Sequence, residues 1–206
     1  MILNQTPVSD KARQLFHASN MPAIQRQSKP FNTTPDDHPW LTTYWDCRRA
    51  IGNGYQTALI GDRGTGKTQL AVELMRRSCR MELTTRYNRL MDFFESIKAT
   101  FGDGAGTEAS VTADYASPQM LILDEAHERT GNAWDTSLFA DLIDRRYAAK
   151  KDTIIIANLE FADVGEAFGP SIMRRVSETG GVIPCTWAPV SAWAGTGATQ
   201  RKDGAK

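Results

Sequence analysis

The feature that most constrains this sequence is a glycine-rich stretch, Gly61–Thr68 (GDRGTGKT), which follows a short apolar run, Thr57–Ile60. A short run of this kind suits a strand that is buried on both faces. After the stretch, apolar residues recur with helical spacing from Leu70 to Met75. The pattern G-x-x-x-x-G-K-[ST] between a strand and a helix is typical of a phosphate-binding loop. We therefore predict that the chain binds a nucleoside triphosphate.

Each residue type in this stretch has a chemical role. Glycines let successive backbone N–H groups curl around a phosphate, and the following helix N-terminus adds partial positive charge. Lys67 would reach the β- and γ-phosphates, and the Thr68 hydroxyl would hold Mg²⁺. An ordinary glycine-rich turn is the alternative, which the strand and helix on either side disfavour. The predicted nucleotide-binding residues are Gly61, Gly64, Thr65, Gly66, Lys67, Thr68 and Gln69.

Composition narrows the class of protein. The 206 residues suffice for one α/β domain with a proper core, and 24 Lys and Arg balance 24 Asp and Glu. No global positive field points to nucleic acid, although local basic patches are possible. Cys47, Cys79 and Cys185 are far apart and lack C-x-x-C spacing, which indicates reduced thiols. Without a long apolar run or a signal pattern, we expect a soluble, cytoplasmic protein with no membrane partner.

A second motif lies downstream, where the apolar run Met120–Asp124 (MLILD) is followed at once by Glu125. An acidic residue at the end of a buried strand helps to hold Mg²⁺ in phosphate-loop proteins, so Asp124 is predicted as a metal ligand with Thr68. Glu125 could polarise the attacking water as a general base. The alternative is a pair of surface acids at a strand end. We interpret the nearby His127 as a local hydrogen-bonding residue.

Strands and helices alternate along the chain, which predicts a parallel sheet with its ligand at the carboxyl ends of the strands. Asn158 ends one strand and could touch the γ-phosphate or the water, or simply begin a turn. The expected strands are Thr57–Ile60, Glu82–Tyr87, Met120–Asp124, Thr153–Ala157 and Gly181–Cys185. The expected helices run from residue 67 to about 80, from a cap at Asn88 to about 101, and over 134–147, 161–168 and 171–176.

The ends of the chain differ from this core. A short helix starting at Ser9 or Asp10 would carry Ala12, Leu15 and Phe16 on one face, followed by an extended connector over 21–39. Residues 1–39 could be a loosely ordered tail or a docking segment whose amphipathic helix fits a partner's groove. Residues 40–190 would form the core, beginning with a helix over 41–51. Residues 191–206 read as a flexible tail.

The chain resembles the AAA+ ATPases of the DnaC/IstB helicase-loader type. This resemblance implies an α/β phosphate-loop fold: a three-layer α-β-α sandwich around a mostly parallel five-stranded sheet, with no C-terminal lid domain. The stretches that carry it are Gly61–Thr68, Leu121–His127, Leu142–Leu159 and Pro170–Val176.

The resemblance also implies roles for individual residues. Asp124 and Glu125 would be the Walker B pair, and Asn158 looks like the sensor-1 residue. In this family an arginine in the short helix before the last strand acts on the nucleotide of a neighbouring subunit. Arg175 matches that position best and Arg174 second. Two solvent-facing arginines on a surface helix are the alternative. The predicted catalytic residues are Glu125, Asn158 and Arg175.

For function, the resemblance implies an ATPase that uses ATP and Mg²⁺, forms homo-oligomers, assembles on single-stranded DNA and loads or opens a replicative helicase. The helicase would dock on residues 1–39, and DNA contacts would come from local cations, with Arg86–Lys98 as candidates. One alternative is an IstB-like ATPase partner of a transposase. Another is a nucleotide-gated binding module with little hydrolysis.

Overall fold

A computed structural model describes residues 9–27, 34, 36–102, 106–128 and 132–189. Its centre is a five-stranded sheet, all parallel, in the order β2-β3-β4-β1-β5. The strands are β1 (Gln56–Ile60), β2 (Thr85–Arg89), β3 (Met120–Asp124), β4 (Asp152–Ile156) and β5 (Val182–Pro184). The predicted α/β fold with a five-stranded sheet is confirmed, and β4 lies between β1 and β3.

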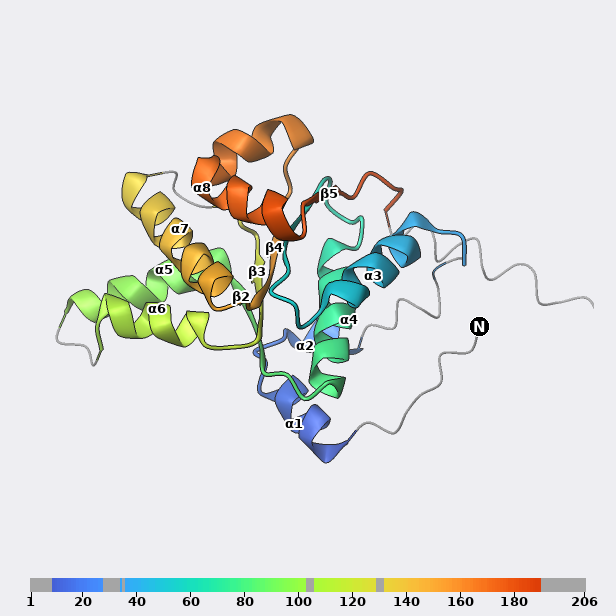
Figure 1. Cartoon of the computed structure of the whole chain (residues 1–206), viewed down its shortest axis with the longest axis horizontal. Helices are drawn as coiled ribbons and strands as arrows, with labels where there is room; N and C mark the ends of the chain where they lie inside the picture. The colour runs from blue at the N-terminus through green and yellow to red at the C-terminus, as the bar shows by residue number, and fades with distance from the viewer. Residues whose placement is uncertain (1–8, 28–33, 35, 103–105, 129–131, 190–206) are drawn as a thin grey trace, which may run out of the picture.

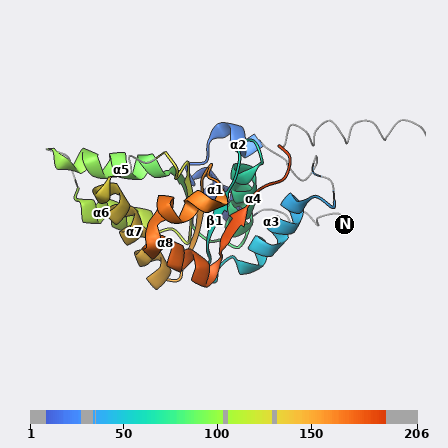
Figure 2. The ribbon, with the colours of Figure 1, turned by 90° about the horizontal axis from the view of Figure 1, so that it is seen from above.

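Helices cover both faces of the sheet, which gives three layers (Figures 1 and 2). One layer contains α1 (Asp10–His17), α2 (Ala23–Gln27), α3 (Pro39–Ala50) and α4 (Lys67–Arg80). The other contains α5 (Leu90–Lys98), α6 (Glu108–Ala116), α7 (Ala133–Ala148) and α8 (Val164–Thr179), with short 3₁₀ turns at Ala99–Phe101 and Phe161–Asp163. Within the described ranges, none of the helices has the length and apolar character needed to cross a membrane.

Alternation along the strands divides the core into two halves. In β3, Met120 and Ile122 belong to the half of the core between the sheet and helices α3 and α4. Leu121 and Leu123 belong to the half between the sheet and helices α5, α7 and α8. Successive side chains of a strand point to opposite faces, so a run without polar residues is required when both faces are covered. The continuous apolar runs in the sequence are therefore explained by burial on both sides.

The second strand begins later than predicted. The expectation of Glu82–Tyr87 is wrong at its start, because residues 82 and 83 complete the C-terminal turn of α4. There the backbone N–H of Leu83 donates to the carbonyl of Ser78 (3.1 Å), and Glu82 has a positive φ of 59°. The strand starts only at Thr85. Local hydrogen bonds at the helix end thus override the β propensity of the preceding residues.

The helix that follows β2 is capped by a different residue. Asn88 was predicted as the cap, but it lies within β2 opposite Leu123. The N-cap position belongs to Arg89, whose backbone N–H donates to the carboxylate of Asp92 (3.0 Å). Backbone pairing with β3 therefore extends one residue past Asn88, whose side chain favours capping.

Helix α6 was not predicted at all. It begins after Thr107, whose hydroxyl accepts from the backbone N–H of Ser110 (3.1 Å), and it buries only Thr112 and Tyr115. A helix that buries so little has no apolar stripe in its sequence, which is why periodicity failed to find it. Residues 103–105, which precede it, and the tail predicted over 191–206 fall outside the described residues.

The N-terminal segment packs onto the core. The cap at Ser9 is confirmed, since its hydroxyl accepts from the backbone N–H of Ala12 (3.1 Å). The apolar face of α1 lies against α4: Ala12 is 2% exposed, and Leu15 and Phe16 pack on the core. This face is already occupied within the chain and is not available to a partner's groove. Residues 21–39 are not wholly extended either, because they include α2.

One arginine has a role that the sequence did not reveal. Arg146 lies in the last turn of α7, where a cation suits the helix dipole, but it is fully buried. Its guanidinium donates to the Thr153 hydroxyl (2.8 Å), to the carbonyl of Pro118 (2.9 Å) and to the carbonyl of Asp152. Burial lowers the pKa of Arg146 to about 9. The side chain ties α7 to the loops that enter β3 and β4.

Candidate nucleotide-binding site

The phosphate loop lies where β1 turns into α4, and its backbone requires glycine at three points. Gly61, Gly64 and Gly66 have φ values of 120°, 84° and 86°, a region that side chains disfavour. A Cβ on Gly61 would also lie 2.7 Å from the carbonyl oxygen of Cys185. The loop is fixed further by Thr65, which is 2% exposed and donates from its hydroxyl to the carbonyl of Asp62 (3.0 Å). Glycine is thus dictated by backbone geometry as well as by ligand access.

Lys67 lies folded into this loop. Its ammonium donates to the carbonyl oxygens of Gly61 (2.7 Å) and Asp62 (2.6 Å), and the residue is 4% exposed. Burial lowers the pKa of Lys67, although the nearby Asp124 opposes this. Two neutral carbonyl groups compensate a buried cation only in part, so an anion bound in the loop would attract this ammonium strongly.

The sheet brings Thr68 and Asp124 together, although they are far apart in sequence. The Thr68 hydroxyl donates to Oδ2 of Asp124 (2.9 Å), and the backbone N–H of Glu125 donates to Oδ1 (2.8 Å). Adjacent ligands of an octahedral Mg²⁺, at about 2.1 Å from the ion, lie about 3 Å apart. The two oxygen atoms therefore have the chemistry and the spacing that Mg²⁺ requires.

Tyr87 is a residue of this site that sequence reasoning missed. Its hydroxyl donates to Oδ2 of Asp124 (2.7 Å) from the neighbouring strand β2. Burial and the adjacent Asp124 raise the pKa of Tyr87, so it remains a donor at neutral pH. Only the register between β2 and β3 creates this contact, and no sequence motif marks it.

Glu125 has an unusual backbone conformation. Its φ is 54°, in the left-handed region, although it is not a glycine. The next residue holds it in place, because the backbone N–H of Ala126 donates to the carbonyl of Ile156 at the end of β4 (2.9 Å). Such strain in a non-glycine residue occurs preferentially at functional sites. The residue is half-buried and directly follows Asp124.

A polar chain connects the end of β4 to the phosphate loop. The backbone N–H of Asn158 donates to Nδ1 of His127 (3.2 Å), and its side-chain amide lies 3.3 Å from Nε2. His127 is therefore a local hydrogen-bonding residue, as predicted. Glu128 continues the chain, since it lies 3.8 Å from Nε2 of His127 and 3.5 Å from Arg63 of the loop. Asn158 is thus linked to the loop through side chains.

Two tryptophans hold the phosphate loop from opposite ends of the chain. The indole N–H of Trp40, in α3, donates to the carbonyl of Gly66 (3.1 Å), and that of Trp187, after β5, donates to the carbonyl of Thr65 (2.6 Å). Trp40 is fully buried, which confirms the prediction that it belongs to the core. Its bond to the loop, and any role for Trp187, had no signal in the sequence.

Gln69, in the first turn of α4, was also predicted to bind nucleotide. Its Oε1 is buried and has no hydrogen-bond partner among the described residues. A buried polar atom of this kind requires an explanation, because leaving it unpaired costs free energy. A ligand or water in the loop would supply a partner.

Arg175 does not join this group of residues in a single chain. Its Nε donates to Asp144 (2.8 Å), and its guanidinium lies over the ring of Tyr147 (4.5 Å). Arg175 lies one helical turn before Thr179. The Thr179 hydroxyl accepts a hydrogen bond from the backbone N–H of Gln56, at the amino end of β1. The phosphate loop is at the other end of that strand. Arg174 also lies apart, in an exposed ion pair with Glu178 (2.9 Å).

Comparison with known proteins agrees with this geometry. The model of the family described as IstB-like ATP binding protein matches residues 9–176. The chain belongs to this IstB-like family. The match includes the phosphate loop and the Asp124–Glu125 pair, so this IstB-like protein shares the ATP-binding region of its family.

Two curated relatives of the IstB-like protein come from Escherichia coli (strain K12). The replicative helicase loader DnaC is 25% identical over 129 residues, which cover 61% of this chain and 51% of DnaC. The uncharacterized protein YdaV is 25% identical over 124 residues, covering 60% of this chain and 50% of YdaV. The chain thus spans about half the length of the curated relatives it matches.

Solved structures show the same fold. The crystal structure of the DnaC helicase loader has a TM-score of 0.62 at 19% identity and covers 75% of this chain and 97% of its own. The crystal structure of DnaI has a TM-score of 0.65 at 13% identity, and the match covers 84% of this chain and 95% of DnaI. The structure of AMPPCP-bound DnaA from Aquifex aeolicus has a TM-score of 0.63 at 17% identity, and the match covers 76% of this chain and 49% of DnaA. The IstB-like protein therefore has the phosphate-loop AAA+ fold.

Proposed function

We propose that this IstB-like protein hydrolyses ATP, assembles with further copies of itself on single-stranded DNA, and loads or opens a replicative helicase. The observation that carries the enzymatic part is the contact between Thr68 and Asp124 (2.9 Å), with Glu125 directly after it. This contact joins the start of α4 to the end of β3 at the carboxyl edge of the sheet, where ligands of such folds bind.

In the proposed reaction, backbone N–H groups of the phosphate loop and the Lys67 ammonium bind the triphosphate. Thr68 and Asp124 would hold Mg²⁺, which supplies charge neutralisation for the phosphate oxygens. Glu125 accepts a proton from the attacking water, and its constrained backbone fixes the position of its carboxylate. Asn158 orients the water or the γ-phosphate, and His127 holds Asn158 in position.

We assign the trans role to Arg175. A guanidinium placed against the γ-phosphate of a neighbouring subunit would stabilise the transition state, typically by about 10³–10⁵ in rate. In the isolated chain Arg175 is paired with Asp144, so assembly would exchange one anionic partner for another. This exchange would make hydrolysis depend on oligomerisation.

The partners are proposed from relatives and from the surface. The curated relative DnaC is a replicative helicase loader, and one DnaA structure of similar fold is described as bound to single-stranded DNA. Residues 1–39 would contact the helicase through exposed side chains, because the apolar face of α1 is packed on α4. Two candidate DNA-binding cations are already paired: Arg86 with Asp114 (2.5 Å) and Arg89 with Asp92 (2.7 Å). DNA would have to displace these carboxylates.

A second candidate function is an ATPase that assists a transposase. The name of the matching family supports it, since the family takes its description from IstB. Both functions use the same nucleotide site and differ in the protein that docks. Reconstitution with a purified hexameric helicase, and separately with a transposase, distinguishes them: the partner that stimulates ATP turnover and co-purifies is the one selected.

The decisive test of hydrolysis is Glu125→Gln. We expect ATP binding to persist and steady-state turnover to fall by at least about 10²-fold, because the general base is lost while the shape of the side chain is kept. Turnover is measured at concentrations that permit assembly, with wild-type protein beside it. Equal turnover in both would exclude the assigned role, and turnover undetectable in both would favour a nucleotide-gated binding module.

A further inference from the structure

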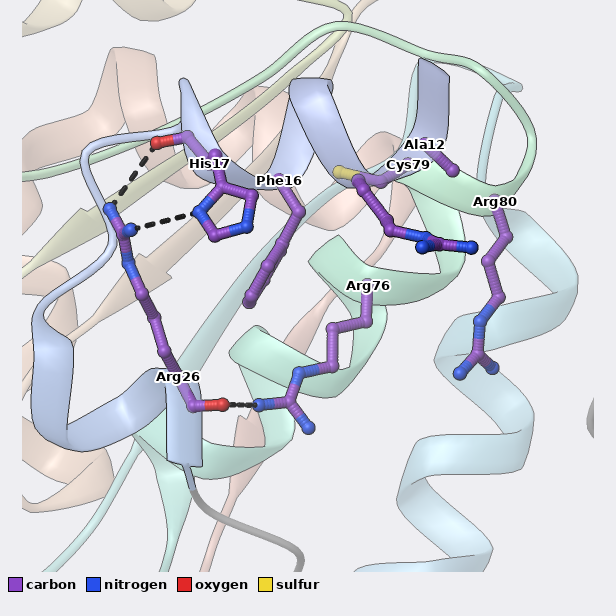
Figure 3. Close-up of a pocket in the computed structure, with 8 residues that line it drawn as sticks. Ala12, Phe16, His17, Arg26, Arg76, Cys79 and Arg80 are labelled. Carbon is purple, nitrogen blue, oxygen red and sulfur yellow. Dashed lines mark hydrogen bonds between the residues drawn. The ribbon is translucent and has the colours of Figure 1, made fainter. Parts of the chain in front are cut away.

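A second concave site lies between α1, α2 and α4, away from the nucleotide site (Figure 3). It has a volume of about 240 Å³. It includes Arg80, the last residue of α4, whereas Lys67 is the first. A helix rises 1.5 Å per residue, so these two residues are about 20 Å apart along its axis. The pocket is therefore separate from the phosphate loop.

Four arginines line this pocket, which we call the arginine pocket. Arg13 and Arg80 are exposed, and Arg26 and Arg76 are half-buried. Among the residues that the structure describes, none that lines the pocket is acidic, in a chain whose total charges balance. Four guanidiniums around one hollow create a local positive field that the net charge conceals.

Two of these guanidiniums are fixed in place. Arg26 donates from Nε to the carbonyl of Met21 (2.8 Å) and from Nη2 to that of His17 (3.3 Å). Arg76 donates to the carbonyl of Arg26 (2.6 Å) and pairs with Glu73 (2.8 Å), as Figure 3 shows for the first of these contacts. Glu73 offsets one charge and Asp10, 3.8 Å from Arg13, offsets part of another, so an excess of positive charge remains. The pocket is thus pre-organised for an anionic group.

Apart from the exposed His17, the rest of the wall is apolar. Ala12 and Cys79 are each 2% exposed, and the ring of Phe16 lies under the guanidinium of Arg76 at 5.3 Å. The pocket is smaller than the roughly 300–1,000 Å³ of small-molecule sites, so it suits one side chain or end group. Its cationic rim and apolar wall match a ligand that combines apolar and anionic parts.

We propose that the arginine pocket docks a protein partner through a segment in which an apolar side chain is flanked by carboxylates. A phosphodiester strand would be matched by cations spaced along a track, with aromatic faces open for stacking. Here the cations surround a single hollow, and the Phe16 face is covered by Arg76. An acidic, partly apolar peptide satisfies both kinds of wall.

This inference rests on the proposed function in one respect, that a protein docks on residues 1–39. It adds the position and the chemistry of the contact. It does not depend on ATP hydrolysis or on whether the partner is a helicase or a transposase.

The test is a selection of peptides from a random displayed library against the full-length protein. A counter-selection uses the double variant Arg13→Glu and Arg80→Glu, which reverses the two exposed cations and leaves the bonded Arg26 and Arg76 intact. We expect wild type to enrich peptides with acidic residues beside an apolar one. Affinity of the best synthetic peptide should fall at least about tenfold in the double variant, because charge-assisted contacts become repulsive.

A matched control reverses two exposed arginines elsewhere, Arg49→Glu and Arg145→Glu, which form surface ion pairs with Asp46 and Asp141. This control should keep peptide affinity within about twofold. Equal loss in both variants would show a general charge effect and overturn the proposal, as would enrichment of no acidic peptide. An oligothymidylate that loses affinity only in the pocket variant, without peptide binding, would instead identify a nucleic-acid site.

The two proposals can fail separately. Nucleotide binding and ATP turnover of the double variant are measured beside wild type, and both should be unchanged. A protein that binds the peptides but does not hydrolyse ATP would refute the proposed enzyme and keep the pocket. A protein that hydrolyses ATP and contacts its partner equally well in both forms would refute the pocket alone.

Discussion

The two edges of the sheet use buried polar groups in opposite ways. At the carboxyl edge, Lys67 contacts loop carbonyls and Thr68 contacts Asp124, partners that an incoming phosphate or cation could replace. At the amino edge, Asp152 accepts from the backbone N–H groups of Gly52 (2.6 Å), Gly54 and Tyr55 (both 3.0 Å). Those partners are fixed parts of the fold.

This difference separates polar groups for binding from polar groups for stability. A buried charge whose partners belong to the strands and to the loops that enter them cannot exchange these partners without unfolding, so its removal should lower stability. A buried charge with few and replaceable partners leaves free energy for a ligand. The variants below test this distinction, beginning with the largest expected effect.

Replacing Arg146, at the amino edge, should have the largest effect. In Arg146→Met, the carbonyl groups of Pro118 and Asp152 lose their donor, and we expect unfolding free energy to fall by about 3–5 kcal/mol. Urea unfolding followed by circular dichroism measures this. The neighbour Arg145 is exposed and pairs with Asp141, so Arg145→Met should cost less than about 1 kcal/mol. Similar costs for both variants would contradict the comparison.

Replacing Lys67, at the carboxyl edge, should affect binding instead. The carbonyl partners of Lys67 lie in the phosphate loop and not at the entry to a strand, so Lys67→Ala should not lower the melting temperature appreciably. Affinity for a non-hydrolysable ATP analogue, measured by calorimetry, should fall by about 100-fold or more. Arg63→Ala, which removes an exposed cation of the same loop, is the control and should change affinity little. Retained affinity in Lys67→Ala would remove the foundation of the site.

Tyr87 should show an intermediate effect. Tyr87→Phe removes one donor to Asp124 while the ring stays packed, and a side chain that hydrogen-bonds to a metal ligand typically contributes about 10-fold to metal affinity. We expect the Mg²⁺ concentration for half-maximal nucleotide binding to rise accordingly. In Tyr115→Phe, which removes a buried hydroxyl near Ser96 on the other side of the sheet, the Mg²⁺ dependence should stay unchanged. A Mg²⁺ dependence that both variants share would argue against the contact.

The smallest effect is expected from the tryptophan contacts. Trp187→Phe keeps an aromatic ring but removes the N–H that binds the Thr65 carbonyl, a bond worth about 1 kcal/mol. Nucleotide affinity should fall about fivefold, as measured by the same titration. Trp134→Phe, on α7, is the control and should leave affinity unchanged. No difference between the two would mean that the loop holds its shape without Trp187.

Local patterns were sufficient for the parts of the fold that bury continuous apolar segments. The strands around Leu59, Ile122 and Ile155 could be predicted because both faces of the sheet are covered. Helix α6 and the start of β2 could not, since α6 buries little and β2 begins only where the end of α4 permits. The residues of the site divide in the same way. Lys67 and Asp124 lie in motifs, whereas Tyr87 and Trp187 contribute only through contacts between distant segments.

Local sequence was enough to infer that a phosphate loop follows a buried strand, and that an acid pair ends another strand of the same parallel sheet. Glycine conformation and strand burial are local requirements, so they are written in neighbouring residues. The packing of the helices, and no local pattern, makes Arg146 a buried support and brings four arginines around one pocket: Arg13, Arg26, Arg76 and Arg80. Charges that are far apart in the sequence acquire such roles only when packing brings their helices together. The same packing determines which partners of a buried charge a ligand can replace.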